Sequence, residues 1–101
     1  SVHWGIEYQK TPSNSQKELA QMAIDAGASL VLGHHPHVIQ PYEKYAGGYI
    51  FYSLGNFVFD QPWSEATRKG EIVKIYFKDS QIDKVETIPI TIANSYQPRP
   101  D

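Results

Sequence analysis

Three of the four histidines in this chain, His34, His35 and His37, stand within five residues, directly after the apolar run at residues 30–32. His35 and His37 are two positions apart, a spacing that puts two side chains on the same side of an extended backbone. Pro36 between them fixes its own φ and biases His35 toward extended geometry. Neutral imidazole is the commonest metal ligand in proteins, and its unperturbed pKa of about 6.5 leaves it mostly unprotonated at neutral pH. The spacing therefore indicates a metal-binding pair, with a solvated histidine-rich turn as the alternative.

The elements predicted around this cluster favour the metal site over the solvated turn. A strand ending at His3, a helix over residues 16–26 and a strand over residues 30–32 follow one another, the order of a βαβ unit with parallel strands. In open α/β sheets, ligands gather at the carboxyl ends of the strands. His3 ends the first strand and the cluster follows the second, so we expect all four histidines at the same edge of the sheet.

Helix signals precede the cluster. Ser15 and Glu18 form a capping-box pattern, and Ser13 with Gln16 offers a second register. Gly27 is a natural residue to end the helix. Four apolar residues then fall on one helical stripe, which we expect to face the sheet: Leu19, Met22, Ala23 and Ala26.

Strands and turns are predicted downstream of the histidines. Val38–Ile39 and Tyr49–Tyr52 flank the Gly47-Gly48 turn and indicate paired strands joined by a tyrosine-bearing loop. The Gly-Asn pair within Ser53–Phe57 suits a turn that needs positive φ, or a backbone brought close to another group.

The last third of the sequence predicts a hairpin. Residues 60–70 are typical of a surface loop with a helical turn. Residues 72–77 and 82–90 alternate as two antiparallel strands around the turn at residues 78–80. The tail from Asn94 is expected to be irregular.

Composition limits the class of protein. A chain of 101 residues with 41% hydrophobic and 20% charged residues is enough for a single domain or domain fragment over residues 1–101. Nine Lys and Arg against eleven Asp and Glu argue against nucleic acid as a partner. No cysteine is present, so a metal must be held by His, Asp, Glu or Asn. The chain carries no targeting signal and no apolar run near the roughly 20 residues of a membrane span.

Because the chain opens on what looks like the end of a buried strand, we expect it to be cut from a longer protein.

Five segments stand in the order found in one bacterial family: HWGIEY at residues 3–8, Gln16 with Leu19-Ala20, DAGA at residues 25–28, GHHPHV at residues 33–38 and YSLGNF at residues 52–57. Over about residues 1 to 60 the chain therefore resembles the poly-γ-glutamate capsule-biosynthesis proteins of the CapA or PgsA type. These form a branch of the calcineurin-like metallophosphoesterases.

The resemblance implies a fold and a site. The fold class would be α/β, the C-terminal part of a sandwich of two sheets flanked by helices, here a short βαβ unit followed by antiparallel strands. The intact family site holds two divalent ions of the Mn, Fe or Zn type at the strand ends. Carried over to this chain, the metal ligands would be His3, His35 and His37, with His35 and His37 also the catalytic residues. His34 occupies the variable position before the pair.

Three further residues match family motif positions around the site. Trp4 and Asn56 are expected in the site wall, and Glu7 is expected either behind the ligands or as a solvated loop carboxylate. The turn that contains Asn56 is expected to be structural rather than catalytic.

One departure from the family pattern limits the activity expected of this chain. The first half of the family domain, which supplies most carboxylate and bridging ligands, is absent. Three imidazoles hold at most one ion, so we expect this isolated fragment to be inactive. Its partners would be the missing N-terminal half and membrane-bound polymer-synthesis proteins.

Two functions remain open. The first is a metal-dependent phosphoesterase (a hydrolase) in capsule biosynthesis, and the second is a non-catalytic assembly or polymer-handling module of a membrane-associated synthesis complex. By resemblance, the parent protein would be extracytoplasmic and membrane-anchored in the cell envelope. Half of a sandwich exposes an apolar face, so the chain is expected to form a homodimer, to pack its hairpin over the gap, or to be marginally stable.

Overall fold

A four-stranded sheet organises the first half of the chain in the computed structural model, which describes residues 1–93 and 96–101. Its strand order is β1-β2-β4-β3. The strands are β1 (Val2–His3), β2 (Leu30–His34), β3 (Ile39–Tyr45) and β4 (Gly48–Leu54). β1, β2 and β4 run parallel, and β3 pairs antiparallel with β4. The predicted βαβ order with parallel strands is confirmed.

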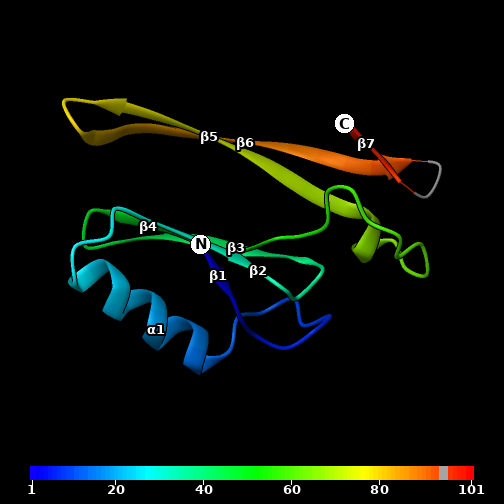
Figure 1. The fold of residues 1–101 in the computed structure, drawn as a ribbon, viewed down its shortest axis with the longest axis horizontal. Helices are drawn as coiled ribbons and strands as arrows, with labels where there is room; N and C mark the ends of the chain where they lie inside the picture. Colours follow the sequence, from blue (N-terminus) through cyan, green and yellow to red (C-terminus); the bar gives the residue numbers. More distant parts are fainter. Residues whose placement is uncertain (94–95) are drawn as a thin grey trace.

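The helix α1 (Asn14–Asp25) connects β1 to β2 and covers one face of this sheet (Figure 1). It begins after Ser13, whose hydroxyl accepts a 3.3 Å hydrogen bond from the Gln16 amide. The Gln16 side chain accepts in return from the Ser13 N–H at 2.8 Å. The capping box therefore uses the second predicted register, and the one that starts at Ser15 is wrong.

The buried face of α1 differs from the predicted stripe. Gln16, Ala20 and Ile24 face the sheet, whereas Leu19 and Met22 are 48% and 65% exposed. A buried glutamine is tolerated here because its amide nitrogen donates to the Gln40 side chain at 2.8 Å while its oxygen caps the helix, so its desolvation is compensated. Around this face lies a core cluster of Trp4, Ala20, Ile24, Val31, Ile50 and Tyr52.

A second sheet covers the opposite face of the first one (Figure 1). It consists of β5 (Lys69–Lys78), β6 (Gln81–Ala93) and β7 (Gln97–Pro100), all antiparallel. The predicted hairpin is confirmed, and both residues of its turn, Asp79 and Ser80, have positive φ, as tight hairpin turns favour. The short helix η1 (Ala66–Arg68) precedes β5, which confirms the predicted helical turn.

Two predictions about strands are wrong. The tail forms β7, whose prolines Pro98 and Pro100 are tolerated because the strand lies at the sheet edge. The start of the predicted irregular tail, Asn94, falls outside the described residues. The tyrosine-bearing segment is not a loop either, because β3 continues through Tyr45 before the turn at residues 46–47.

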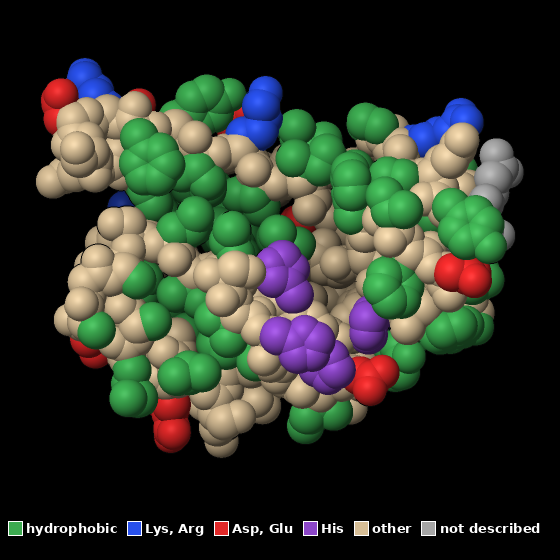
Figure 2. Space-filling view, viewed as in Figure 1, with side chains coloured by type: hydrophobic (Ala, Val, Ile, Leu, Met, Phe, Trp, Pro, Cys, Tyr) green, Lys and Arg blue, Asp and Glu red, His purple; other side chains and the backbone are tan. Residues whose placement is uncertain are grey.

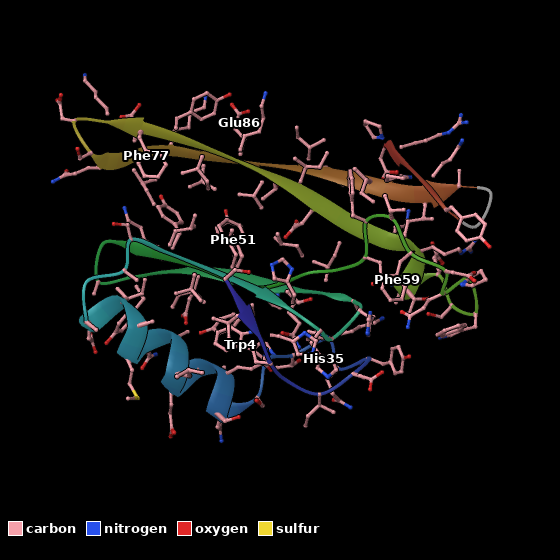
Figure 3. All side chains as sticks on the ribbon, in the orientation of Figure 1. Trp4, His35, Phe51, Phe59, Phe77 and Glu86 are labelled. Atoms are coloured by element: carbon pink, nitrogen blue, oxygen red, sulfur yellow. The ribbon has the colours of Figure 1, made fainter. Side chains whose placement is uncertain are left out.

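The two sheets bury a second layer of side chains between them. Along β4, Ile50 and Tyr52 face α1, whereas Phe51 points toward the hairpin (Figure 3) and has no exposed surface. Its ring stacks on Tyr42 with centroids 4.9 Å apart. Of the three outcomes expected for the open face, the structure shows the hairpin packed over the gap. No helix in the described part of the chain has the length and apolarity needed to cross a membrane.

Candidate functional site

The four histidines lie at one edge of the first sheet, where β1 and β2 end. His3 and His34 are register partners in these parallel strands, so the two strand ends lie side by side. The next residues, His35 to Val38, leave the sheet and lead into β3. Figure 2 shows the histidine side chains gathered beside a hollow on one face of the molecule. The prediction that the histidines share one sheet edge is confirmed.

The imidazoles of His3, His35 and His37 are neighbours. The ring centroids of His3 and His35 are 4.3 Å apart, and those of His35 and His37 are 5.8 Å apart. A pocket of about 340 Å³ is lined by the four histidines on one side and by Gly55–Phe59 on the other. Half of the pocket wall is therefore nitrogen-rich, and the other half carries apolar side chains from the segment after β4.

The backbone of the cluster is not the extended one that Pro36 predicted. His35 has a φ of +110° and His37 a φ of +63°, both in the region that favours glycine. Such conformations cost of order 1 to 3 kcal/mol each and persist only where the surroundings impose them. Two hydrogen bonds do so here, from the Tyr8 N–H to the Pro36 carbonyl at 2.8 Å and from the Trp4 N–H to the His34 carbonyl at 3.0 Å. Strain of this kind is concentrated at functional sites in proteins.

Asn56 makes a direct contact with the cluster. Its side-chain oxygen lies 3.0 Å from Nδ1 of His37. The residue is 5% exposed, and its amide nitrogen donates to the Gln61 side chain at 3.0 Å and to the Thr67 carbonyl at 2.9 Å. Asn56 was expected in the site wall, but its hydrogen bond to His37 was not predicted. The Gly-Asn turn signal located the residue without revealing its partner.

Two aromatic rings lie beside His37. The ring of Phe59 lies 5.0 Å from that of His37, and the ring of Tyr8 lies 6.1 Å from it. Figure 3 shows Phe59 on the segment after β4, which forms the pocket wall opposite His35. Sequence reasoning missed both residues, since single aromatic side chains in loops carry no spacing signal.

The remaining predicted residues lie around the pocket in different ways. Trp4 is buried below it, where its Nε1–H donates to the Tyr52 carbonyl at 2.8 Å. His34 lines the pocket, and desolvation lowers the pKa of its imidazole. Glu7 is exposed in the loop before Tyr8 and does not line the pocket.

Comparison with known proteins identifies the family of this chain. Residues 1–61 match the model of the bacterial capsule synthesis protein family PGA_cap. The chain belongs to this family. It is 49% identical over 90 residues to the PGA biosynthesis protein CapA of Bacillus subtilis, covering 89% of this chain and 23% of that protein. It is 43% identical over 100 residues to the capsule biosynthesis protein CapA of Bacillus anthracis, covering 99% of this chain and 24% of that protein.

A more distant relative is a probable polyglutamine synthesis accessory protein of Mycobacterium tuberculosis, 37% identical over 60 residues, which are 59% of this chain and 16% of that protein. The chain thus spans about a quarter of the length of the two Bacillus relatives. The family match includes every histidine and Asn56, and it ends before η1 and the second sheet. The resemblance to capsule and poly-γ-glutamate biosynthesis proteins is confirmed, and these relatives link the chain to that process.

The histidines that line the pocket are chemically suited to bind a divalent ion, because neutral imidazoles are good ligands for Zn²⁺ and similar ions. As the side chains are placed, no three His, Asp or Glu groups within residues 1–93 and 96–101 converge closely enough to hold an ion. Binding through all three imidazoles would require at least one ring to turn. The ligand set His3, His35 and His37 stays a prediction.

Proposed function

We propose that this chain is the histidine-bearing part of a metal-dependent phosphoesterase domain that acts in poly-γ-glutamate capsule biosynthesis. The observation that carries the proposal is the grouping of the His3, His35 and His37 rings around one pocket at the strand ends. Family membership supports the biological process. The positive φ values of His35 and His37 support a functional rather than an incidental turn.

Each side chain has a role in this proposal. His35 and His37 would hold a divalent ion together with His3 in the chain's half of the site. When bound, such an ion lowers the pKa of a water molecule and stabilises charge on a phosphoryl oxygen. An imidazole not engaged with the ion can donate a proton to the leaving oxygen. Phe59 forms part of the opposite wall of the pocket, beside the ring of His37.

The isolated chain is proposed to be inactive. Among the residues that the structure describes, the pocket is lined by imidazoles, Asn56 and apolar side chains, and by no carboxylate. A site with two ions needs carboxylate and bridging ligands, which the rest of the longer protein would supply across the open side of the pocket. That longer protein would be anchored in the membrane and work outside the cytoplasm beside polymer-synthesis proteins.

Metal analysis and phosphoesterase assays on the full-length protein test the proposal. Wild type is expected to copurify with a divalent metal and to hydrolyse phosphodiester or phosphomonoester substrates. His35→Ala is expected to lose both properties. Lys17→Ala, on the exposed side of α1, serves as the matched control and should keep both. Hydrolysis that survives His35→Ala would refute the metal-hydrolase function.

A second function draws support from the apolar half of the pocket. Phe57, Val58 and Phe59 are 49%, 64% and 41% exposed, so this wall presents apolar surface to solvent. A non-catalytic module that handles the polymer or assembles the synthesis complex would use such a wall for contact. Metal-free protein that sustains full capsule production would favour this second function.

A further inference from the structure

The side-chain amide of Asn56 is held in one orientation. Its Nδ2 donates to the carbonyl oxygen of Thr67 at 2.9 Å, and a carbonyl oxygen can only accept. The same nitrogen donates to the side-chain oxygen of Gln61 at 3.0 Å. A flipped amide would place two oxygens against each other at Thr67. The assignment of nitrogen and oxygen in Asn56 therefore follows from its partners.

This orientation decides which atom of Asn56 faces His37. The amide oxygen Oδ1 lies 3.0 Å from Nδ1 of the imidazole, and an amide oxygen can only accept. Nδ1 must then carry the proton. A neutral imidazole has a single N–H, so Nε2 keeps its lone pair.

We propose that Asn56 is a positioning residue that holds His37 as the Nδ1–H tautomer and so keeps the Nε2 lone pair available to a ligand in the pocket. Histidine free in water favours the opposite tautomer, with the proton on Nε2. A protein group that accepts from Nδ1 is therefore needed to prepare the ring before an ion or a proton donor arrives.

The surroundings of Asn56 are built to keep it in place. Thr67 is 1% exposed, and its hydroxyl donates to the Gln61 carbonyl at 2.6 Å. Its backbone N–H donates to the Ser64 hydroxyl at 3.1 Å. The segment between β4 and β5 is thus tied to itself and holds one amide against one imidazole.

The use of this tautomer in catalysis rests on the proposed function, whereas the tautomer itself is a property of the metal-free protein. The two can therefore fail separately. His35 and His3 provide internal references, because neither has a hydrogen-bond partner for its ring among the described residues.

Nitrogen NMR on the metal-free full-length protein, labelled with ¹⁵N at histidine, tests the inference. Spectra are recorded well above the ordinary imidazole pKa of about 6.5, and His37 is assigned from the signal lost in His37→Gln. Wild type is expected to show a protonated Nδ1 and an unprotonated Nε2 at His37. A protonated Nε2 in wild type overturns the inference without any variant.

A variant at position 56 tests the cause. Asn56→Ala should shift His37 toward the Nε2–H tautomer and weaken Zn²⁺ binding by about 10- to 100-fold. The proton signal of the Trp4 indole reports whether the variant is folded. A His37 tautomer unchanged in folded Asn56→Ala overturns the inference. The expected tautomer in a protein without phosphoesterase activity supports the positioning role and counts against the proposed function.

Discussion

The indole N–H of Trp4 donates a 2.8 Å hydrogen bond to the backbone carbonyl of Tyr52, although the two residues are 48 positions apart. The bond joins the end of β1 to β4 and crosses β2 at Gly33. Trp4 follows His3 directly, and its backbone N–H donates to the His34 carbonyl. The indole bond therefore helps to hold the two strand ends that carry these histidines.

Gly33→Ala is expected to break the hydrogen bond between Trp4 and Tyr52. A Cβ at position 33 would overlap both the Tyr52 carbonyl oxygen and the Trp4 indole nitrogen. Neither backbone nor buried indole can yield easily, so the free energy of unfolding should fall by about 3 kcal/mol. Urea denaturation measures this loss. Gly47→Ala is the control, since its Cβ meets open space and only its φ of +83° is penalised, by about 1 kcal/mol. Equal losses in the two variants would contradict the close approach at Gly33.

Gln16→Leu should destabilise the chain even though it replaces a buried polar residue by an apolar one. The change leaves the Gln40 side-chain oxygen and the Ser13 N–H without their partner. A buried group without a partner costs about 1 to 3 kcal/mol, so a loss of about 2 kcal/mol or more is expected in urea denaturation. Leu19→Gln on the exposed face should change stability by less than about 0.5 kcal/mol. If Leu19→Gln destabilised the chain more than Gln16→Leu, the predicted apolar stripe with Leu19 would be the buried face of the helix.

Ser13→Ala should remove the helix cap. The Ser13 hydroxyl accepts from the Gln16 N–H, so its loss should cost about 1 kcal/mol of unfolding free energy. Ser15→Ala is the matched control one register along, with an expected change below about 0.5 kcal/mol. Thermal unfolding of both variants distinguishes the two registers, and a larger effect at Ser15 would contradict the one described.

Glu71 should make the chain less stable as the pH rises. The residue is half-buried in a pocket of about 270 Å³ between the sheets, and burial raises the pKa of its carboxyl above the usual 4.5. The folded state therefore binds this proton more tightly than the unfolded state, and stability falls as the pH rises from 4.5 through the higher folded-state pKa. Glu71→Gln should be more stable than wild type at about pH 7, with the difference lost near about pH 4. Urea midpoints at both pH values measure it, and a difference that persists at the lower pH would exclude burial of the charge as the cause.

Chain order and local pattern were sufficient for much of the fold. The βαβ order brought His3 and the cluster at His34 to one sheet edge, because parallel strands end on the same side. Strand alternation and turn residues located the β5–β6 hairpin. These features depend on neighbours a few residues apart, which a sequence displays directly.

The features that only the tertiary structure decided all depend on distant partners. Gln16 can be buried because its amide nitrogen donates to the Gln40 side chain. His37 is oriented by the contact between its Nδ1 and the side-chain oxygen of Asn56. The strained backbone of His35 is held in part by the loop that contains Tyr8. The sequence by itself determined that the four histidines lie at one sheet edge and which family the chain belongs to. The fold decided how each side chain is presented, because hydrogen-bond partners far apart in the chain have no local signature.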